Sequence, residues 1–353
     1  MVKTTVKAAV FAVPGDLATP TGGYAYDRRM IAELAALGWR TDVLNLGEGF
    51  PRLTANTRAA ACARLAALPS AAPIVIDGLA FGVLPEAAKK MQASHLLVAL
   101  VHHPLALESG LSADEAAGLH VSERLALAAA RRVVTTSAAT ARLLTADYCI
   151  ASERLSVVEP GTDRGGEARP RKNDDALALL AVGAVVERKG YDLLVAALAK
   201  LKHLNWRLVI AGDHGRSPEA FRRLEADIAW FGLADRITLL GALSAQQLVS
   251  LYAASDLFVL PSRFEGYGMA FAEAIAHGLP VIGTTAGAIP QTVPAGAGIL
   301  VRPDDVDALA SALRRLIENP HEREQLAAGA RAATFPSWKE QAALFAGVLD
   351  RLA

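Results

Sequence analysis

Two glutamates, Glu265 and Glu273, lie on either side of a turn that contains Gly266 and Gly268. The apolar run before the turn predicts a strand that ends at Leu260, and a helix is expected to begin near Gly268. The first N–H groups of such a helix, together with its dipole, form a site for a phosphate or diphosphate. The two carboxylates could then bind hydroxyl groups at two distances from the phosphate, such as those on the hexose and the ribose of a nucleotide sugar. On spacing alone, a helix-terminal acid and a solvated helix residue explain the pair equally well.

Candidate polar residues of the N-terminal half also lie at the ends of predicted elements. His102 directly follows the apolar run 96–101, and a histidine at the carboxyl end of a buried strand fits a catalytic role as well as a structural one. Gly22 and Gly23 precede a predicted helix, where they would form a flexible loop with free N–H groups near a ligand. A simple turn explains the two glycines equally well.

The elements that must position these residues repeat along the whole chain. Short apolar runs rich in β-branched residues alternate with longer helix-like segments, which predicts parallel strands covered by helices and an α/β fold. The predicted strands are residues 6–13, 41–46, 73–77, 96–102, 132–136, 155–159, 177–182, 207–211, 237–240, 257–260, 280–283 and 298–301. In such sheets, ligands bind beyond the carboxyl ends of the strands.

A polar segment divides this pattern into two parts. Residues 161–175 are rich in glycine and charged side chains, which is typical of a linker. We therefore expect an N-terminal Rossmann-like domain over residues 1–163, a linker over 164–173 and a second Rossmann-like domain over 174–334, with a cleft between the domains. A last helix, residues 337–353, begins after a serine cap signal and carries an apolar stripe, so we expect it to cross back onto the first domain.

Composition excludes several classes of protein. The 36 basic and 36 acidic residues give a formal net charge of zero, which argues against nucleic-acid binding by bulk charge. Hydrophobic residues make up 52% and charged residues 20%, which excludes a disordered chain. Two cysteines do not make a disulfide framework or a zinc cluster.

Hydropathy sets the expected location of the protein. The longest apolar runs, such as residues 176–186, are shorter than the ~20 residues of a membrane span. We see no signal peptide and expect a cytoplasmic protein. Peripheral contact with a membrane and the oligomeric state stay open.

The segment from Pro261 to Val281 resembles the signature of retaining GT-B glycosyltransferases of the family-4 (glycosyl transferases group 1) type. These enzymes commonly read Pro-Ser-x-x-Glu-x-Phe-Gly-x-x-x-x-Glu-Ala-x-Ala-x-Gly-x-Pro-Val, and Tyr267 takes the place of the phenylalanine. Further similar motifs follow in order at residues 22–23, 102, 159–163, 182–183, 189–190 and 211–213. The resemblance implies two tandem doubly wound domains and transfer of a sugar from a UDP- or GDP-sugar to an acceptor, with retention of anomeric configuration.

The resemblance also implies a role for each matching residue. Glu273 would bind the ribose hydroxyls, Glu265 the hydroxyls of the transferred sugar, and His102 would contact that sugar. Lys189 would neutralise the leaving phosphate. Donor binding would also involve Gly22, Gly23, Arg188, Gly212, Tyr267, Gly268 and Met269.

We expect neither a metal nor a cofactor. The chain has no Asp-x-Asp pair and no cluster of histidine and cysteine with the spacing of metal ligands. Helix amides and Lys189 would then stabilise the leaving diphosphate.

One position departs from the family pattern. Family members usually carry an arginine where this chain has Ala184, so that Arg188 or Arg216 would have to supply the missing charge. A nucleotide-sugar epimerase or phosphorylase of the same fold, or a non-catalytic nucleotide-sugar-binding protein, are the alternatives. The sequence does not identify the acceptor, the sugar or the base.

Overall fold

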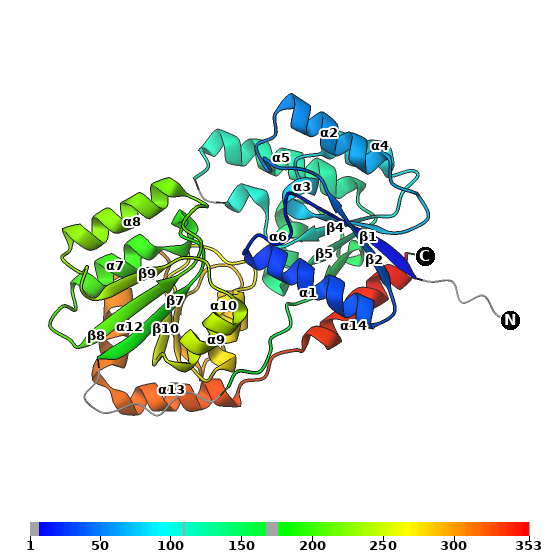
Figure 1. Ribbon diagram of the computed structural model, residues 1–353. Helices are drawn as coiled ribbons and strands as arrows, with labels where there is room; N and C mark the ends of the chain where they lie inside the picture. Colours follow the sequence, from blue (N-terminus) through cyan, green and yellow to red (C-terminus); the bar gives the residue numbers. More distant parts are fainter. Residues whose placement is uncertain (1–6, 109, 167–175, 353) are drawn as a thin grey trace. The chain divides into compact units, whose positions relative to one another are not determined.

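The computed structural model describes residues 7–108, 110–166 and 176–352 (Figure 1). Most of the predicted linker, from residue 167 onward, lies outside the described residues. The chain divides into two compact units, one formed by Met1–Gly161 with Pro336–Ala353 and the other by Thr162–Phe335. Each unit is built around its own parallel sheet, which confirms the predicted α/β class.

The sheet of the first unit has six parallel strands in the order β2-β1-β3-β4-β5-β6. The strands are β1 (Ala8–Val13), β2 (Arg40–Asn45), β3 (Ile74–Asp77), β4 (Leu97–Val101), β5 (Arg132–Thr135) and β6 (Leu155–Val157). The α-helices are α1 (Gly22–Ala36), α2 (Ala55–Ala66), α3 (Gly78–Phe81), α4 (Pro85–Met91), α5 (Ala113–Ala129), α6 (Ala138–Asp147) and α14 (Trp338–Asp350). Short 3₁₀ turns occupy Leu105–Leu107 and Ser152–Arg154.

The second sheet also has six parallel strands, in the order β12-β11-β10-β7-β8-β9. The strands are β7 (Leu177–Val182), β8 (Trp206–Ala211), β9 (Ile237–Leu240), β10 (Leu257–Val259), β11 (Val281–Thr284) and β12 (Gly298–Val301). The α-helices are α7 (Tyr191–Ala199), α8 (Pro218–Trp230), α9 (Ala245–Ala253), α10 (Met269–Ala276), α11 (Ile289–Thr292), α12 (Val306–Glu318) and α13 (Pro320–Ala332). A 3₁₀ turn covers Glu187–Lys189.

Strand order identifies the edge of each sheet where a ligand is expected. The order reverses between β1 and β3 in the first sheet and between β7 and β10 in the second. Loops that leave neighbouring strands on opposite sides of such a switch point open a crevice at the carboxyl ends of the strands. The loops after β1, β3, β7 and β10 therefore border the places where a ligand is expected.

Helix α14 belongs to the first unit although it is last in the chain. A capping box between Ser337 and Glu340 starts it, and it packs beside α1 (Figure 1). The ring centroids of Trp338 and Tyr26 lie 5.8 Å apart, and those of Phe345 and Phe11 of β1 lie 6.0 Å apart. This helix thereby covers apolar surface of the first sheet.

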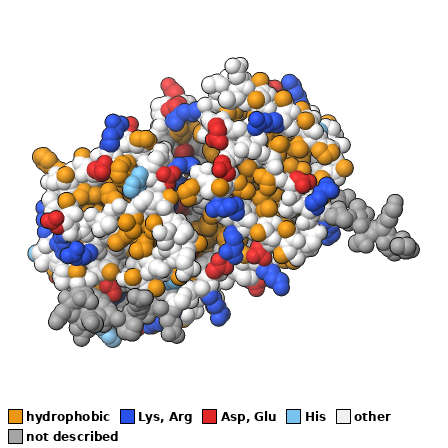
Figure 2. Space-filling model, viewed as in Figure 1, with side chains coloured by type: hydrophobic (Ala, Val, Ile, Leu, Met, Phe, Trp, Pro, Cys, Tyr) orange, Lys and Arg blue, Asp and Glu red, His pale blue; other side chains and the backbone are white. Residues whose placement is uncertain are grey.

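The surface carries both signs of charge. Figure 2 shows basic and acidic side chains interspersed over the displayed face, as the zero formal charge leads one to expect. Among the described residues, no helix is both long enough and apolar enough to span a bilayer.

Candidate functional site

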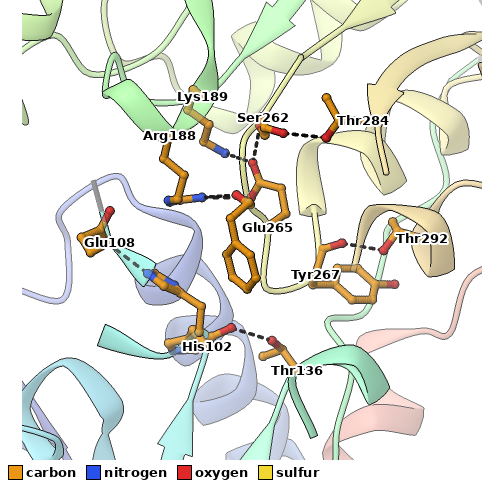
Figure 3. Close-up of polar contacts among 12 residues, drawn as sticks. His102, Glu108, Thr136, Arg188, Lys189, Ser262, Glu265, Tyr267, Thr284 and Thr292 are labelled. Carbon is orange, nitrogen blue, oxygen red and sulfur yellow. Dashed lines mark hydrogen bonds and ion pairs between the residues drawn. The ribbon is translucent and has the colours of Figure 1, made fainter. Parts of the chain in front are cut away.

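Glu265 is the centre of a buried charge cluster in the loop that follows β10. The residue is only 7% exposed. Its Oε1 lies 2.7 Å from Lys189 Nζ, and its Oε2 lies 3.4 Å from Arg188 Nη1 (Figure 3). Ser262 Oγ donates a further hydrogen bond to Oε1 at 2.7 Å. One carboxylate thus faces two cations at the switch point of the second sheet.

The two cations keep Glu265 ionised. Burial alone would raise the pKa of this carboxyl group, but the charges of Lys189 and Arg188 and the hydrogen bonds from Lys189 and Ser262 outweigh it and lower the pKa to about 2. The carboxylate therefore stays an acceptor of hydrogen bonds throughout the physiological range of pH.

The loops after β7 and β10 are fastened to each other by backbone and side-chain contacts. The Arg263 N–H donates to the Arg188 carbonyl at 2.7 Å, and Arg188 Nη1 donates to the Phe264 carbonyl at 2.8 Å. Arg263 Nη1 and Nη2 donate hydrogen bonds to the two carboxylate oxygens of Asp192, at 3.0 and 2.7 Å. Gly190 has φ 69°, and a Cβ there would lie 2.2 Å from the Pro261 carbonyl oxygen. The turn that carries Arg188 and Lys189 therefore has a fixed place beside Glu265.

Helix α10 starts directly after this loop. Gly268, with φ 95° and ψ 50°, occupies the cap position and supplies no side-chain acceptor for the first N–H groups of the helix. Met269 is the first helical residue, and the neighbouring Tyr267 is buried, with its carbonyl accepting from Thr292 Oγ1 at 2.5 Å. An uncapped helix N-terminus beside two cations is an environment suited to a diphosphate.

Glu273 lies further along α10 and has a partner that the sequence did not indicate. The hydroxyl of Tyr252, on α9, donates to Glu273 Oε2 at 2.9 Å. Tyr252 is fully buried and stacks on His277 at 4.8 Å between ring centroids. Burial raises the pKa of Glu273, the nearby Asp163 charge raises it further, and the Tyr252 hydrogen bond opposes both.

Gly212 serves the same edge of the sheet by its lack of a side chain. A Cβ on Gly212 would lie 1.9 Å from the Gly183 carbonyl oxygen, so that only glycine allows the loops after β7 and β8 to approach this closely. Its N–H already faces the carbonyls of Leu240 and Gly241, each at 3.2 Å. Its contribution to the site is therefore this close approach.

In the first unit, His102 follows β4 and lies between two carboxylates. His102 Nε2 is 3.1 Å from Asp27 Oδ1 and 3.6 Å from Asp77 Oδ2. Asp77 ends β3 and Asp27 lies on α1, so the cluster forms at the switch point of the first sheet. The adjacent His103 has a different partner, because its Nε2 lies 3.1 Å from Glu108 Oε2.

The predicted loop at Gly22 and Gly23 is the first turn of α1. Thr21 caps the helix by accepting the Tyr24 N–H, which explains why the helix starts before the position expected from the sequence. A Cβ on Gly23 would lie 3.0 Å from His102 Cδ2. Gly23 therefore makes room for the His102 ring.

The cluster in the first unit also bears on metal binding. The donor atoms of Asp27, Asp77 and His102 lie within 4.8 Å of one another, close enough to surround one ion. Hydrogen bonding accounts for the same spacing, because a single Nε2–H can be shared by both carboxylates. No spacing in the sequence indicates this group, since its three members come from separate elements.

Sequence comparisons find similarity to glycosyltransferases. Residues 167–333 match the model of the family described as Glycosyl transferases group 1. D-inositol 3-phosphate glycosyltransferase 1 from Catenulispora acidiphila is 35% identical over 240 residues, which cover 62% of this chain and 56% of the relative. The aligned region thus spans little more than half the length of that relative.

Solved structures with the same arrangement of strands and helices are also found. Sucrose-phosphate synthase from Thermosynechococcus elongatus matches with a TM-score of 0.81 at 22% identity, covering 98% of this chain and 99% of the other. HepE from Anabaena, solved in complex with UDP-glucose, matches with a TM-score of 0.75 at 18% identity, covering 97% and 99%. The second half of the chain thus matches the glycosyl transferases group 1 family, and the chain has the GT-B fold.

Proposed function

We propose that this chain transfers a hexosyl group from a nucleoside-diphosphate sugar to an acceptor hydroxyl, with retention of anomeric configuration and without a metal ion. The observation that carries the proposal is the Arg188–Lys189–Glu265 cluster beside the N-terminus of α10. The family match supports it, as does the likeness to HepE, whose structure was solved with UDP-glucose.

In this proposal, different residues of the second unit bind the diphosphate, the transferred sugar and the ribose of the donor. The diphosphate would face Lys189, Arg188 and the first N–H groups of α10 at Gly268 and Met269. Glu265, held as a carboxylate, would accept hydrogen bonds from hydroxyls of the transferred sugar, and Glu273 from those of the ribose. Tyr267 and Gly212 shape the turns around these groups.

Arg188 is our candidate for the charge that the family supplies at the place of Ala184. Its guanidinium reaches the same carboxylate as Lys189, and Arg263 fixes its backbone. Donor phosphate oxygens would replace Glu265 as the partner of both cations. Arg188 and Lys189 would then act as a pair on one diphosphate.

The reaction exchanges one bond to the anomeric carbon for another. The bond from that carbon to the diphosphate oxygen breaks, and the leaving oxygen receives the electron pair and is stabilised by the cations. The acceptor oxygen bonds to the same face of the carbon, and its proton passes to an oxygen of the leaving diphosphate. His102 of the first unit, with Gly22 and Gly23 beside it, is proposed to act on the sugar side of the donor.

Release of nucleoside diphosphate tests the proposal. We would incubate the protein with UDP-glucose or GDP-mannose, and with D-inositol 3-phosphate as the first acceptor, because the relative from Catenulispora is named for it. Release of UDP or GDP that depends on acceptor, yields an α-linked product from the α-linked donor and survives EDTA is the expected result.

Other outcomes would replace the proposal. Interconversion of nucleotide sugars without release of diphosphate would indicate an epimerase, and dependence on orthophosphate a phosphorylase. Tight donor binding without turnover over a panel of acceptors would indicate a binding protein. Loss of activity in EDTA with rescue by Mg²⁺ or Mn²⁺ would contradict the metal-free mechanism.

A further inference from the structure

Both acid partners of His102 use the same ring nitrogen. Asp27 Oδ1 and Asp77 Oδ2 lie 3.1 and 3.6 Å from Nε2. Nε2 is the ring nitrogen for which the structure records partners, and the His102 side chain keeps 18% of its surface exposed. Nδ1 is therefore the ring nitrogen left for a ligand.

The two carboxylates have different surroundings. Asp77 Oδ1 caps α3 by accepting the Leu79 N–H at 2.7 Å, which stabilises Asp77 as an anion. Asp27 is 0% exposed, and its Oδ2 has no hydrogen-bond partner among the described residues. A buried carboxylate with one unsatisfied oxygen depends on a nearby cation. In this cluster that cation is His102.

The ring has little freedom to leave this position. Tyr26 meets it edge-on at 5.3 Å between centroids, and Gly23 lies against its Cδ2 edge. The Thr136 hydroxyl donates to the His102 carbonyl at 3.2 Å and occupies one of the two lone pairs of that oxygen (Figure 3). Nδ1 is the hydrogen-bonding atom that the ring itself can offer to a ligand.

We propose that Asp27 and Asp77 are positioning residues that hold His102 by Nε2–H as a permanent imidazolium, so that Nδ1–H is a fixed donor toward an oxygen of the bound donor substrate. This inference rests on the proposed function for the identity of that oxygen, a hydroxyl of the transferred sugar. It assigns His102 the role of a charged hydrogen-bond donor and excludes that of a general base at neutral pH.

The electrostatics of the cluster agree with its geometry. Burial lowers the pKa of His102, but the charge and hydrogen bond of Asp27, with those of Asp77, outweigh burial and raise the pKa to about 10. The other titratable groups nearby are Tyr26, whose hydroxyl donates to the Val158 carbonyl, and His103, which is paired with Glu108. The imidazolium is therefore expected to persist well above neutral pH.

The direct test is NMR spectroscopy of the ¹⁵N- and ¹³C-histidine-labelled protein without substrate. The resonances of His102 are assigned by their loss in His102→Gln, and the exposed His203 serves as an internal reference. We expect both nitrogens of His102 to stay protonated up to at least pH 8.5. In Asp27→Asn, the midpoint of the His102 titration should fall by about 1–3 pH units, as expected for the loss of an adjacent opposite charge.

Kinetics then separates positioning from structural support. Asp27→Asn should lower kcat about 10- to 100-fold, the effect of a lost hydrogen bond to a charged group. The affinity for UDP or GDP should be unchanged, because the proposed diphosphate site lies wholly in the second unit. The double variant with His102→Gln should lose no more than His102→Gln alone. Glu108→Gln, which removes the acid partner of the neighbouring histidine, is the matched control and should keep wild-type kcat.

Several results would overturn the proposal. These are a neutral His102 at pH 7 in the wild-type protein, equal kcat losses in Asp27→Asn and Glu108→Gln, or thermal stabilisation by Zn²⁺ or Mn²⁺ that Asp27→Asn abolishes. If Asp27→Asn fails to fold, the titration of the wild-type protein and that of Asp77→Asn still show whether His102 is charged at pH 7. Failure of the proposed function looks different: His102 would titrate as stated while no nucleotide sugar is turned over.

Discussion

The two units carry charge clusters of opposite construction at equivalent places. In the second unit one carboxylate, Glu265, lies between two cations, Arg188 and Lys189. In the first unit one histidine, His102, lies between Asp27 and Asp77. Both clusters sit at the carboxyl ends of strands beside a switch point. The two cations of the second-unit cluster suit it to an anion, whereas the two carboxylates of the first-unit cluster keep its histidine protonated.

Lys189→Gln should break the second-unit cluster most severely. The variant removes a charge proposed to stabilise the leaving diphosphate, and turnover should fall by about 100-fold or more. Nucleoside diphosphate release measured at saturating donor checks this. Lys200→Gln, which removes an exposed lysine paired with Asp307, should keep the wild-type rate. A loss below threefold would show that Lys189 does not face the leaving group.

Glu273→Gln should produce the next largest effect, and on binding. Loss of a charge-assisted hydrogen bond to the ribose corresponds to about 1.5–3 kcal/mol, or about 10- to 160-fold in Kd for UDP or GDP. Because burial and Asp163 raise the pKa of Glu273 above 4.5, wild-type affinity should decline in acid with a midpoint above that value. Calorimetry as a function of pH checks this, and the variant should show a smaller acid decline, because the terminal phosphate of the ligand takes up a proton at about pH 6 with either protein. An identical decline in the variant would assign it to another group.

Tyr252→Phe should act in the same direction but more weakly. It removes one hydrogen bond to Glu273 Oε2 and leaves the ring stacked on His277, so we expect a loss of about 1 kcal/mol, or roughly fivefold in Kd. The 2′,3′-dideoxy nucleotide should bind the variant and the wild-type protein equally, because it cannot reach Glu273. Tyr191→Phe, in which the lost hydroxyl bonds the Gly183 carbonyl, is the control for loss of a buried phenol. Equal losses for both nucleotides would place the effect of Tyr252 elsewhere.

The sequence predicted the second-unit cluster far better than the first. The residues of the second unit lie in two short motifs, 183–190 and 261–281, so their spacing along the chain reports their proximity in space. Asp27, Asp77 and His102 come from three separate elements, and only His102 and Asp77 lie at the end of a predicted strand, where a signal was available. Tyr252 was not predicted for a related reason. In the sequence, a tyrosine on an amphipathic helix is indistinguishable from a core residue, and only the structure shows that its hydroxyl donates to Glu273.

The central strands of both sheets follow from continuous apolar runs, because they are buried on two faces. The edge strand β2 is largely exposed. The short helices α3 and α11 were not predicted, since each is four residues long and has no apolar period to detect. The start of α1 at Gly22 depends on the Thr21 cap, which overcomes the low helix propensity of two glycines.

Nucleoside diphosphate binding to Glu265→Gln tests the central claim most directly. In the structure, Glu265 is the partner of both cations that we assign to the diphosphate, so that the carboxylate and the phosphate oxygens compete for the same charges. Calorimetric titration with UDP and GDP should therefore show wild-type or tighter affinity in Glu265→Gln, while sugar transfer falls. Lys189→Gln should weaken the same binding. A Glu265→Gln protein that loses diphosphate affinity as Lys189→Gln does would contradict the account.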